Sequence, residues 1–422
     1  MTRTDAVRDS RTAPRTVLIS GAGVAGTALA YWLDRYGFAV TVVEKAGAPR
    51  NGGYPVDIRG TAREVVRRMG ILPRLQGAHI ELRALTFLEG DGDEVASVDP
   101  HLVTGGVAGD LEVRRGELTE ALYTAVRDDV EFVFGDSVAT LDQSGHGADV
   151  TFHGGGTRTF DMVIGADGLH SRTRASVFGP EEQFHRYLGY RFAGFTLPAP
   201  LGRCREVVLW NAPGRAAALY SVGDGDAVHA LLTFAHPEPS YEVSRHPQAQ
   251  RDLVASVFAD AGWELPGLLA ALRDADDLYA DTVGQIRMPR WSRGRVALVG
   301  DAAYAPSFLT GQGTSLALVG AYMLAGSLAD RDHTAGFAAY ERTTRAFVTA
   351  NQDLVREGGA ALVPATARDL ERRNARLRGL GARPATAGTA AHAALTLPEF
   401  TSASDAGSAG RGCQDGRCQE VS

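Results

Sequence analysis

The chain has 422 residues and a formal net charge of -7, and its 43 basic and 50 acidic side chains are spread along the sequence without a basic block for nucleic acid. Its length predicts two domains, and a hydrophobic content of 44% fits a globular enzyme. Glycines interrupt the one long apolar run, residues 17–33, so we expect no membrane-spanning segment and a cytoplasmic protein. We expect neither nucleic acid nor a membrane as a partner, and a monomer or weak dimer.

The first glycine-rich segment is typical of a dinucleotide-binding turn. Residues 17–19 predict a buried strand, and residues 27–36 predict a helix. The turn between them carries three glycines in Gly-x-Gly-x-x-Gly spacing: Gly21, Gly23 and Gly26. A pyrophosphate requires this succession of strand, tight turn and helix start. Glu44 follows a second predicted strand and lies near the offset of about 20 residues expected for a carboxylate that binds ribose hydroxyls.

Two more glycine-rich segments follow in the chain. One contains Asp167 and Gly168, and the other begins at Gly300 and Asp301 and reaches Gly311 and Gly313. No second Gly-x-Gly-x-x-Gly occurs, so a permanent nicotinamide-binding domain is not supported.

The middle of the chain predicts a separate sheet. Residues 205–210, 216–222 and 227–234 alternate between apolar and polar types, which is typical of half-buried strands. Helical spacing returns at residues 253–258 and 268–272. We expect this sheet to form the floor of a substrate pocket. Five aromatic side chains are candidates for its walls, although an aromatic-rich core is the default explanation: Tyr190, Phe192, Phe195, Trp210 and Tyr220.

The C-terminal third predicts helices and then a disordered tail. Tyr340, Phe347 and Leu354 recur at seven-residue intervals, a stripe that one long helix could lay across both domains. Residues 384–422 contain few large apolar side chains, so we expect them to be disordered. Cys413 and Cys418 lie in this tail, where two exposed thiols are a better explanation than a metal or redox pair, because no histidine supports a metal site.

The three glycine segments, in this order, resemble those of flavoprotein monooxygenases of the aromatic hydroxylase type, a family that includes the tetracycline-inactivating monooxygenases. The resemblance implies an α/β fold in which a Rossmann-like FAD-binding domain is interleaved with a β-sheet substrate domain, followed by a long C-terminal helix. We place the FAD-binding domain at residues 15–75, 106–180 and 285–330, the substrate domain at 76–105 and 181–284, a helical segment at 331–383 and the tail at 384–422.

The resemblance also implies the cofactor and the residues that contact it. FAD is the expected cofactor, with NADPH or NADH as a transient co-substrate. Arg115 matches the family's Val-x-Arg-x-x-Leu arginine, although an exposed arginine at a helix start is the alternative. Asp57 lies in a loop that resembles the one beside the flavin, and Arg50 is a candidate for NAD(P)H. The remaining implied FAD contacts are Gly21, Gly23, Gly26, Glu44, Asp167, Gly168, Asp301, Gly311 and Gly313.

The helix expected at residues 314–328 has a predicted electrostatic role. Its free backbone N–H groups and positive dipole end would face the glycine turn. Reduced flavin is an anion, which such a helix start stabilises without a basic side chain. An ordinary glycine-rich loop before a core helix is the alternative.

His229 is the best candidate for a residue of the substrate pocket. It lies in a stretch that resembles a strand of the tetracycline-inactivating enzymes whose histidine faces the substrate, and alternation puts it on one side with Leu231 and Thr233. A structural or solvent-facing histidine is the alternative. The arginine that those relatives have nearby is replaced by Leu209 or Trp210, which places a tetracycline substrate in doubt.

We therefore expect an FAD-dependent monooxygenase that uses NAD(P)H and O2 to oxygenate an aromatic or polyketide-like small molecule, with hydroxylation through a C4a-hydroperoxyflavin as the expected reaction and no metal. A flavin dehydrogenase or oxidase without oxygen transfer remains open. A non-catalytic interaction protein with a dinucleotide-type fold is a further alternative. A flavin-dependent halogenase is disfavoured because no two of the four tryptophans are spaced as Trp-x-Trp.

Overall fold

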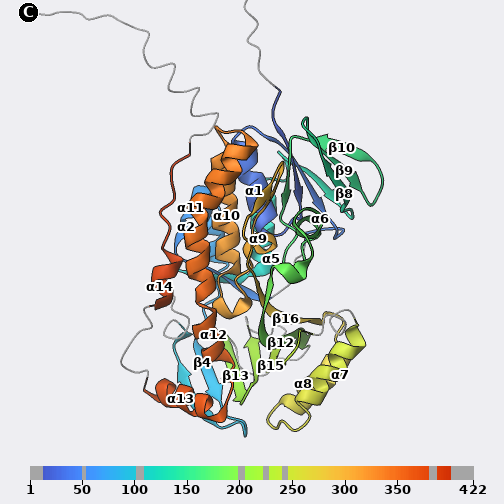
Figure 1. Cartoon of the computed structure of the whole chain (residues 1–422). Coiled ribbons are helices and arrows are strands. Elements are labelled where there is room, and N and C mark those ends of the chain that lie inside the picture. Colours follow the sequence, from blue (N-terminus) through green and yellow to red (C-terminus); the bar gives the residue numbers. More distant parts are fainter. Residues whose placement is uncertain are drawn as a thin grey trace, which may run out of the picture.

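The protein folds into two lobes, each built around its own β-sheet (Figure 1). The computed structural model describes residues 13–49, 54–100, 109–197, 205–221, 228–239, 246–379 and 387–400. The chain passes between the two sheets several times, because strands that are distant in sequence are neighbours in both of them. An α/β fold in which two sheets are interleaved along the chain is therefore confirmed, while the predicted domain limits stay a prediction.

The upper sheet brings the three glycine segments to one edge. Its strands, in order across the sheet, are β17 (Ser292–Arg293), β18 (Val296–Leu298), β11 (Met162–Gly165), β1 (Thr16–Ser20), β2 (Ala39–Glu44) and β7 (Glu131–Phe134). β1 is parallel to β2 and β11, and β11 is parallel to β18. The carboxyl ends of parallel strands meet at the same edge of a sheet, and ligands of open α/β sheets bind there. Gly21, Ala166 and Val299 directly follow β1, β11 and β18, so the three segments converge there.

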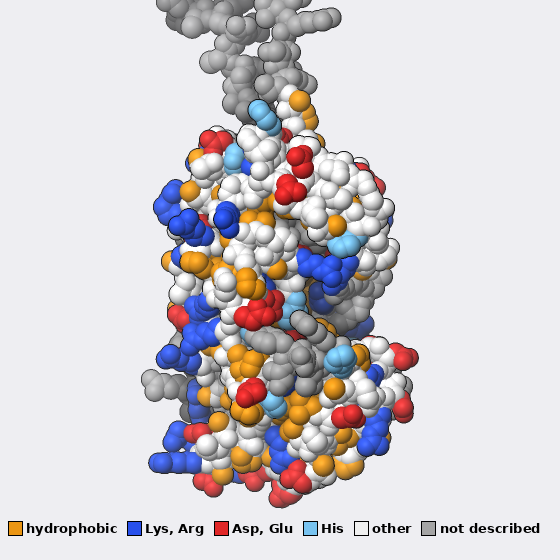
Figure 2. All heavy atoms as spheres, turned by 45° about the vertical axis from the view of Figure 1, so that its right-hand side comes forward, with side chains coloured by type: hydrophobic (Ala, Val, Ile, Leu, Met, Phe, Trp, Pro, Cys, Tyr) orange, Lys and Arg blue, Asp and Glu red, His pale blue; other side chains and the backbone are white. Residues whose placement is uncertain are grey.

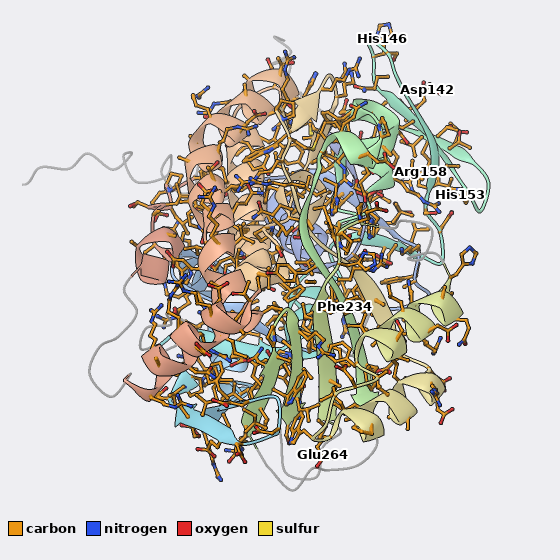
Figure 3. All side chains as sticks on the ribbon, turned by 60° about the horizontal axis from the view of Figure 1, so that its bottom comes forward. Asp142, His146, His153, Arg158, Phe234 and Glu264 are labelled. Carbon is orange, nitrogen blue, oxygen red and sulfur yellow. The ribbon has the colours of Figure 1, made fainter. Side chains whose placement is uncertain are left out.

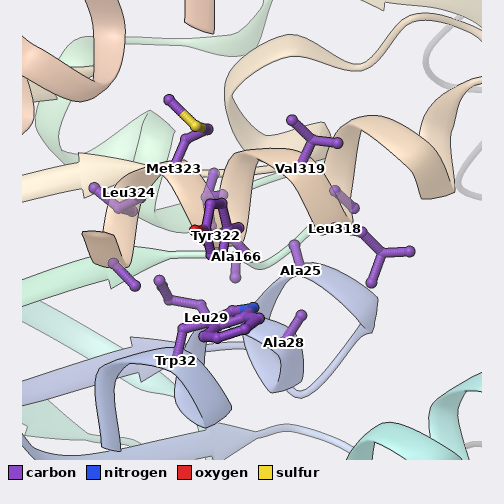
Figure 4. Packing of buried hydrophobic residues seen from close by; sticks show 14 of the residues in the cluster. Ala25, Ala28, Leu29, Trp32, Ala166, Leu318, Val319, Tyr322, Met323 and Leu324 are labelled. Carbon is purple, nitrogen blue, oxygen red and sulfur yellow. The ribbon is translucent and has the colours of Figure 1, made fainter. Parts of the chain in front are cut away.

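Two helices pack tightly beside this sheet. α1 (Val24–Arg35) follows the first glycine turn, and α10 (Gly313–Leu328) follows the third. Small residues on α1 and large ones on α10 interdigitate around Trp32, as Figure 4 shows. Gly300 lies where these helices approach each other, because a Cβ atom on it would stand 2.7 Å from the Cβ of Ala25. Close packing therefore requires glycine at this position.

The lower sheet has seven strands and two different faces. Its order is β16 (Tyr279–Ile286), β12 (His185–Leu197), β15 (Val228–Ala235), β14 (Arg215–Ser221), β13 (Glu206–Ala212), β4 (Ala84–Leu88) and β5 (Glu94–Val98). The outer face, which includes Phe234 (Figure 3), packs against α7 (Pro247–Val257) and α8 (Leu265–Asp274). The opposite face, here called the inner face, lies toward the upper lobe, because Phe192 on it contacts Phe308 of the loop before α10.

The remaining elements complete the two lobes. Two smaller sheets pair β3 (Pro55–Ile58) with β6 (Leu111–Arg114), and β8 (Val138–Gln143) with β9 (Ala148–Phe152) and β10 (Thr157–Phe160). The second of these projects from the upper lobe, where Figure 3 labels Asp142, His146, His153 and Arg158. The other helices are α2 (Thr61–Arg68), α3 (Leu72–Gly77), α5 (Arg115–Thr124), α6 (Arg172–Phe178), α9 (Asp301–Tyr304), α11 (His333–Asp353), α12 (Val355–Leu362), α13 (Ala367–Arg378) and α14 (Ala387–His392), with short 3-10 turns at Glu181–Gln183 and Phe308–Thr310.

The predicted long helix exists, and part of the predicted disordered tail is ordered. α11 is the long C-terminal helix, and it packs Tyr340 and Phe347 into the core of the upper lobe. The prediction of disorder from residue 384 is wrong for residues 387–400. Leu397 is buried in the same core, and Phe400 contacts Gly326 of α10. Three large apolar side chains, spaced along this segment, are enough to hold it against the helices: Leu395, Leu397 and Phe400.

For two of the five aromatic side chains, the structure decides between a pocket wall and the hydrophobic core. Phe195 and Trp210 are buried in the outer-face core with α7 and α8, so they do not line a pocket. Trp210 donates its indole N–H to the Gly90 carbonyl at 3.1 Å. The strands predicted at residues 205–210, 216–222 and 227–234 are confirmed as β13, β14 and β15 to within a few residues. Among the described residues, no helix is both long and apolar enough to cross a membrane.

Candidate functional site

The first glycine turn combines a tight bend with an open side. Gly21 has φ +108°, a conformation that side-chain-bearing residues rarely adopt, and a Cβ atom on it would stand 2.6 Å from the Ala166 carbonyl oxygen. A Cβ atom on Gly26 would stand 1.9 Å from the Gly21 carbonyl oxygen, so helix and turn touch there. Gly23 differs, because nothing lies within 4 Å of the Cβ it lacks. The open side of the turn is thus at Gly23, where α1 begins without a side-chain cap.

Glu44 braces this turn from the end of β2. One oxygen of its carboxylate accepts the Ala22 N–H at 2.9 Å, and the other accepts the Ala46 N–H at 2.9 Å. A carboxylate offers about four lone-pair positions, so these two bonds leave acceptor capacity on the side of the turn. The structure therefore places Glu44 beside the glycine turn, and its contact with a ribose stays a prediction.

The N-terminus of α10 is a prepared site for negative charge. Its N-cap residue, Gln312, makes no side-chain cap hydrogen bond, and the first N–H groups of a helix have no intrahelical partner. The buried amide oxygen of Gln312 has no hydrogen-bond donor among the described residues. Gly311 adopts φ +64° and turns the chain into the helix. Such a helix start attracts an anion through its N–H groups and its dipole.

Asp301, Arg115 and Tyr54 lie within electrostatic reach of one another near this helix start. Asp301 Oδ1 is 3.9 Å from the position of a Cβ atom on Gly313. Burial raises the pKa of the Tyr54 hydroxyl, the Asp301 carboxylate raises it further, and the Arg115 guanidinium opposes both. Arg115 is the first residue of α5, and its guanidinium forms no hydrogen bond or ion pair with the residues that the structure describes. It is therefore a positive charge held ready beside the site.

Asp57 belongs to a group of charged side chains on the two-stranded sheet. It forms an ion pair with Arg59 at 2.9 Å and faces Glu112 in the register of β3 and β6. Burial and the charge of Asp57 raise the pKa of Glu112 to about 8, although Arg59 opposes this shift. A cavity of about 60 Å³ lies beside these charged side chains. It has room for water-sized groups but not for an aromatic ring.

The segment with Asp167 and Gly168 is fixed by its own helix. The Asp167 carboxylate accepts from the Ser171 hydroxyl at 2.5 Å and from the Thr173 N–H at 2.9 Å, in the first turn of α6. Gly168 has φ +82°, and nothing lies within 4 Å of the Cβ it lacks. Asp167 thus shapes the loop, and a direct contact of either residue with a cofactor stays a prediction.

An ion-pair network that the sequence did not reveal links this segment to the lower sheet. His170 lies 2.8 Å from Glu181 and 2.7 Å from Asp281 of β16, and these hydrogen bonds, first Asp281 and then Glu181, raise the pKa of His170 to about 10. Arg174, which is fully buried, binds Glu181 at 2.6 Å and donates to the Ala302 carbonyl at 3.0 Å. Figure 2 shows acidic, basic and histidine side chains side by side where the two lobes meet.

The inner face of the lower sheet presents aromatic side chains and His229 toward the upper lobe. The ring of Phe192 contacts those of Tyr279 and Phe308, with centroids 5.6 and 5.0 Å away. Burial and the carboxylates of Glu112 and Asp57 raise the pKa of the Tyr220 hydroxyl, so Tyr220 also faces the charged group on β3 and β6. His229 is the register partner of Tyr220.

Alternation along β15 places His229 as predicted. Val228, Ala230 and Leu232 belong to the outer-face core with α7 and α8. His229 and Leu231 therefore point to the inner face, because successive side chains of a strand alternate between its two faces. The role of His229 in a substrate pocket remains a prediction.

Sequence reasoning missed several residues of this site. Tyr54 belongs to the same loop as Asp57, and an aromatic residue in that loop was the available signal. Asp281 contacts His170 from 111 residues along the chain, and Thr196 contacts His229 across 33 residues, so only the fold brings these pairs close. Arg50 lies outside the described residues, so its proposed contact with NAD(P)H has no structural description. Among the described residues, no group of three or more His, Cys, Asp and Glu side chains could hold a metal ion.

The open positions fit the predicted dinucleotide cofactor. Gly23 and Gly168 belong to the first and second glycine segments, which converge at the strand ends. A Cβ atom on either of them would meet empty space. Two helix starts without side-chain caps, those of α1 and α10, supply N–H donors for phosphate and for a second anionic group. Arg115 adds a positive charge that acts on Asp301. This donor set suits FAD, which carries a pyrophosphate and a ring system that becomes anionic on reduction.

Comparison with known proteins agrees with this site. The family described as FAD binding domain matches residues 15–354. A flavin-dependent monooxygenase from an unknown prokaryotic organism is 36% identical over 393 residues, 92% of this chain and 99% of that protein. An uncharacterized protein of Mycobacterium tuberculosis H37Rv is 44% identical over 83% of this chain and 95% of its own. The crystal structure of tetracycline destructase Tet(55) has a TM-score of 0.79 and 34% identity, covering 92% of this chain and 99% of Tet(55).

Proposed function

Because the chain belongs to the FAD-binding-domain family of flavin-dependent monooxygenases, we propose that it uses NAD(P)H and O2 to hydroxylate an aromatic or polyketide-like small molecule. The protein is an FAD-dependent monooxygenase; the electron donor and the substrate class are the proposed part. The name of tetracycline destructase Tet(55) supports a multi-ring substrate. Either Leu209 or Trp210 replaces the arginine of the tetracycline-inactivating relatives, and of these two Leu209 lies on the inner face while Trp210 lies in the outer-face core, so we propose a different ring system.

One observation carries this proposal. Three glycine segments meet at one edge of the upper sheet, and the third of them, ending at Gly313, lies close to the inner face of the lower sheet. The contact between Phe308 and Phe192 joins these two regions directly, with ring centroids 5.0 Å apart. A cofactor held by the glycine segments would therefore have its redox-active end beside an aromatic surface of the substrate lobe.

The chain's own groups would divide the work of holding the cofactor. The first glycine turn and the N-terminus of α1 would take the pyrophosphate, with Glu44 at the ribose. Asp301, Arg115 and Asp57 are the side chains that we propose for the remaining contacts. When bound, FAD supplies the redox chemistry, accepting a hydride from NAD(P)H and activating O2.

The helix start of α10 would set the electrostatics of the reaction. Its free N–H groups and dipole stabilise negative charge, which favours the reduced, anionic cofactor over the oxidised one. No described lysine or arginine is needed for this effect, since the charge comes from backbone groups that are fixed before the reaction begins.

The inner face would hold the substrate and keep water away. Phe192, Tyr279 and Phe308 offer flat apolar surfaces on which an aromatic ring can stack. Excluding water protects a reactive oxygen donor from hydrolysis and side reactions. His229 lies on the same face and would contact a polar substituent of the substrate.

Hydride delivery would come from NAD(P)H that binds only briefly. The sequence has a single Gly-x-Gly-x-x-Gly turn, so we propose no resident nicotinamide site, and Arg50 is the residue we propose to meet the NAD(P)H phosphates. We further propose that the enzyme acts in the cytoplasm as a monomer or weak dimer.

The experiment that tests this function follows oxygen atoms. The FAD-loaded protein is screened against aromatic and polyketide-like compounds for faster NAD(P)H oxidation, and each hit is rerun under ¹⁸O₂ with hydrogen peroxide measured in parallel. We expect one ¹⁸O atom in the product. Peroxide stoichiometric with NAD(P)H and no labelled product would instead identify an oxidase, and a product reduced at the expense of NAD(P)H, with neither peroxide nor label, would identify a dehydrogenase.

A further inference from the structure

One carboxylate joins the aromatic inner face to the second glycine segment. Asp281 of β16 is the register partner of Phe192, and Tyr279 lies two residues before it, so all three side chains share the inner face. The Tyr279 hydroxyl donates to Asp281 Oδ2 at 3.2 Å. His170, in the loop after Gly168, binds the same oxygen through Nε2 at 2.7 Å. Asp281 therefore ties an aromatic residue of the substrate lobe to a residue of the cofactor lobe.

The surroundings of Asp281 fix it as an ionised acceptor. Burial would raise the pKa of its carboxyl group, but the hydrogen bond and charge of His170, with the Thr282 N–H and the Tyr279 hydroxyl, lower that pKa below its ordinary value. The second oxygen, Oδ1, accepts the Thr282 N–H at 2.7 Å. An ionised carboxylate has no proton to donate. The single proton of the Tyr279 hydroxyl must therefore point to Asp281.

His170 is itself held from its other side. Its Nδ1 lies 2.8 Å from Glu181, and Glu181 also binds the buried Arg174, which donates to the Ala302 carbonyl beside the third glycine segment. Both ring nitrogens face carboxylates, which only accept, so both carry protons, in agreement with a pKa of about 10. The position of Asp281 is therefore set by contacts with two of the glycine segments.

The phenol oxygen of Tyr279 is left as an acceptor. Its proton is committed to Asp281, its lone pairs remain, and no described residue donates a hydrogen bond to it. The side chain is 49% exposed, and Tyr54 is the only other large apolar side chain among the described residues that is as exposed. Burial, then Asp281, Tyr54 and Asp301 in that order, raise the pKa of the Tyr279 hydroxyl. The hydroxyl therefore lies between the inner face and Asp301, where cofactor and substrate would meet.

We propose that the Tyr279 oxygen accepts a hydrogen bond from a phenol or enol hydroxyl of the substrate, and that Asp281 and His170 hold Tyr279 in the orientation that makes this possible. An ether has no hydroxyl proton to donate, so the site favours the hydroxyl compound over its methyl ether. Asp281 and His170 are positioning residues, and Tyr279 is the group that meets the substrate. This inference rests on the proposed function, since it names the polar group of the same substrate.

The hold of Asp281 on Tyr279 can be read without turnover. The FAD-loaded protein is labelled with ¹³Cζ-tyrosine, and Tyr279→Phe identifies the signal of this ring by its loss. We expect the wild-type ring to stay neutral at about pH 10.5, where an ordinary tyrosine is mostly ionised, because the Asp281 carboxylate opposes a second charge. Asp281→Asn should let Tyr279 ionise at lower pH, whereas Asp276→Asn, at an exposed carboxylate before β16, should not. A signal that titrates alike in all three proteins would overturn the role of Asp281.

A probe pair tests the selection of a hydroxyl donor. The dissociation constants of phenol and anisole are measured from the change in flavin absorbance of the FAD-loaded protein. We expect phenol to bind several-fold more tightly than anisole, His170→Gln to reduce this preference, and Tyr279→Phe, which keeps the ring, to abolish it. Equal affinities in the wild type, or a preference that survives Tyr279→Phe, would overturn the selection. Because neither readout needs oxygen transfer, a protein that passes both tests and fails the ¹⁸O₂ experiment would refute the monooxygenase proposal alone.

Discussion

Gly311 lies against Asp57, since a Cβ atom on Gly311 would stand 3.0 Å from the carboxylate oxygen Oδ2 of Asp57. This contact joins the turn before α10 to the strand β3, two parts of the chain that were assigned to the cofactor separately from sequence. The Ser315 hydroxyl reinforces it by accepting the Arg59 N–H at 3.1 Å. Contacts within the chain therefore hold the turn before α10 against β3.

Two glycines of the first turn should respond to alanine in opposite ways. Gly26→Ala puts a Cβ atom 1.9 Å from a backbone oxygen, so we expect the apoprotein to lose about 1–3 kcal/mol of unfolding free energy or more. Gly23→Ala meets empty space, so the apoprotein should keep its stability while FAD affinity falls at least about tenfold, or ~1.4 kcal/mol. Denaturant unfolding and FAD titration measure the two effects. Unchanged FAD affinity in Gly23→Ala would contradict a pyrophosphate at this turn.

Asp301→Ala should yield protein that purifies without FAD. Asp301 follows Gly300 at the edge where the glycine segments meet. Its carboxylate raises the pKa of Tyr54, and the Arg115 guanidinium opposes that shift. The ratio of flavin to protein absorbance after gel filtration measures the loss. Asp128→Ala is the matched control, because Asp128 is an exposed aspartate after α5. Full flavin content in Asp301→Ala would count against the assignment of the third glycine segment.

His229→Ala should keep FAD and lose turnover. The residue lies on the inner face of the lower sheet and is far in sequence from the glycine segments, so its removal leaves the cofactor contacts intact. We expect wild-type flavin content and a clear drop in kcat/KM for the substrate found by screening. Thr233→Ser, on the same strand, is a control for local repacking. Wild-type turnover in His229→Ala would reject its place in the pocket.

The His170 network should make stability depend on pH in one direction. The folded-state pKa of His170 is about 10, above its ordinary value of 6.5. The stabilisation is therefore complete below pH 6.5, as long as Glu181 and Asp281 are ionised, and is lost as pH rises toward 10, because the unfolded chain releases the proton first. We expect wild type to exceed His170→Gln in unfolding free energy most between pH 4.5 and 6.5 and to approach it above pH 10. A difference that grows with pH would show that the sign is wrong.

The ordered segment at residues 387–400 should contribute to stability. Leu397 is 8% exposed, so Leu397→Ala removes core packing and should cost about 2–4 kcal/mol of unfolding free energy. Thr396→Ala, at an exposed position of the same segment, is the control that should have little effect. Equal stability of the two variants would restore the original prediction of a disordered tail from residue 384.

The sequence predicted the elements that have a strong local signal. Gly21 and Gly26 mark their own turn because backbone geometry and close contacts demand glycine there, and the alternation in residues 227–234 showed which face His229 would take. The helix after Gly313 was likewise visible as an unbroken apolar run. Each of these signals depends on neighbours in the chain.

Long-range pairings were beyond reach for a physical reason. Thr196 and Asp277 are 81 residues apart, and a hydrogen bond between them leaves no periodicity in the sequence. Phe195 and Trp210 have the composition of a pocket wall, and only the position of α7 and α8 decides that they are core. Disorder was predicted for residues 387–400 because the composition of the whole segment 384–422 is polar. Three buried or partly buried apolar side chains are nevertheless enough to hold this part against the core.

A crystal structure of the protein with FAD tests the central claim most directly. We predict that the pyrophosphate lies at Gly23 and the N-terminus of α1, and that the isoalloxazine ring lies between Gly313 and the inner face that carries Phe192 and Tyr279. Electron density for FAD at another place would contradict the account. So would an isoalloxazine ring turned away from the inner face, with that face already filled by side chains.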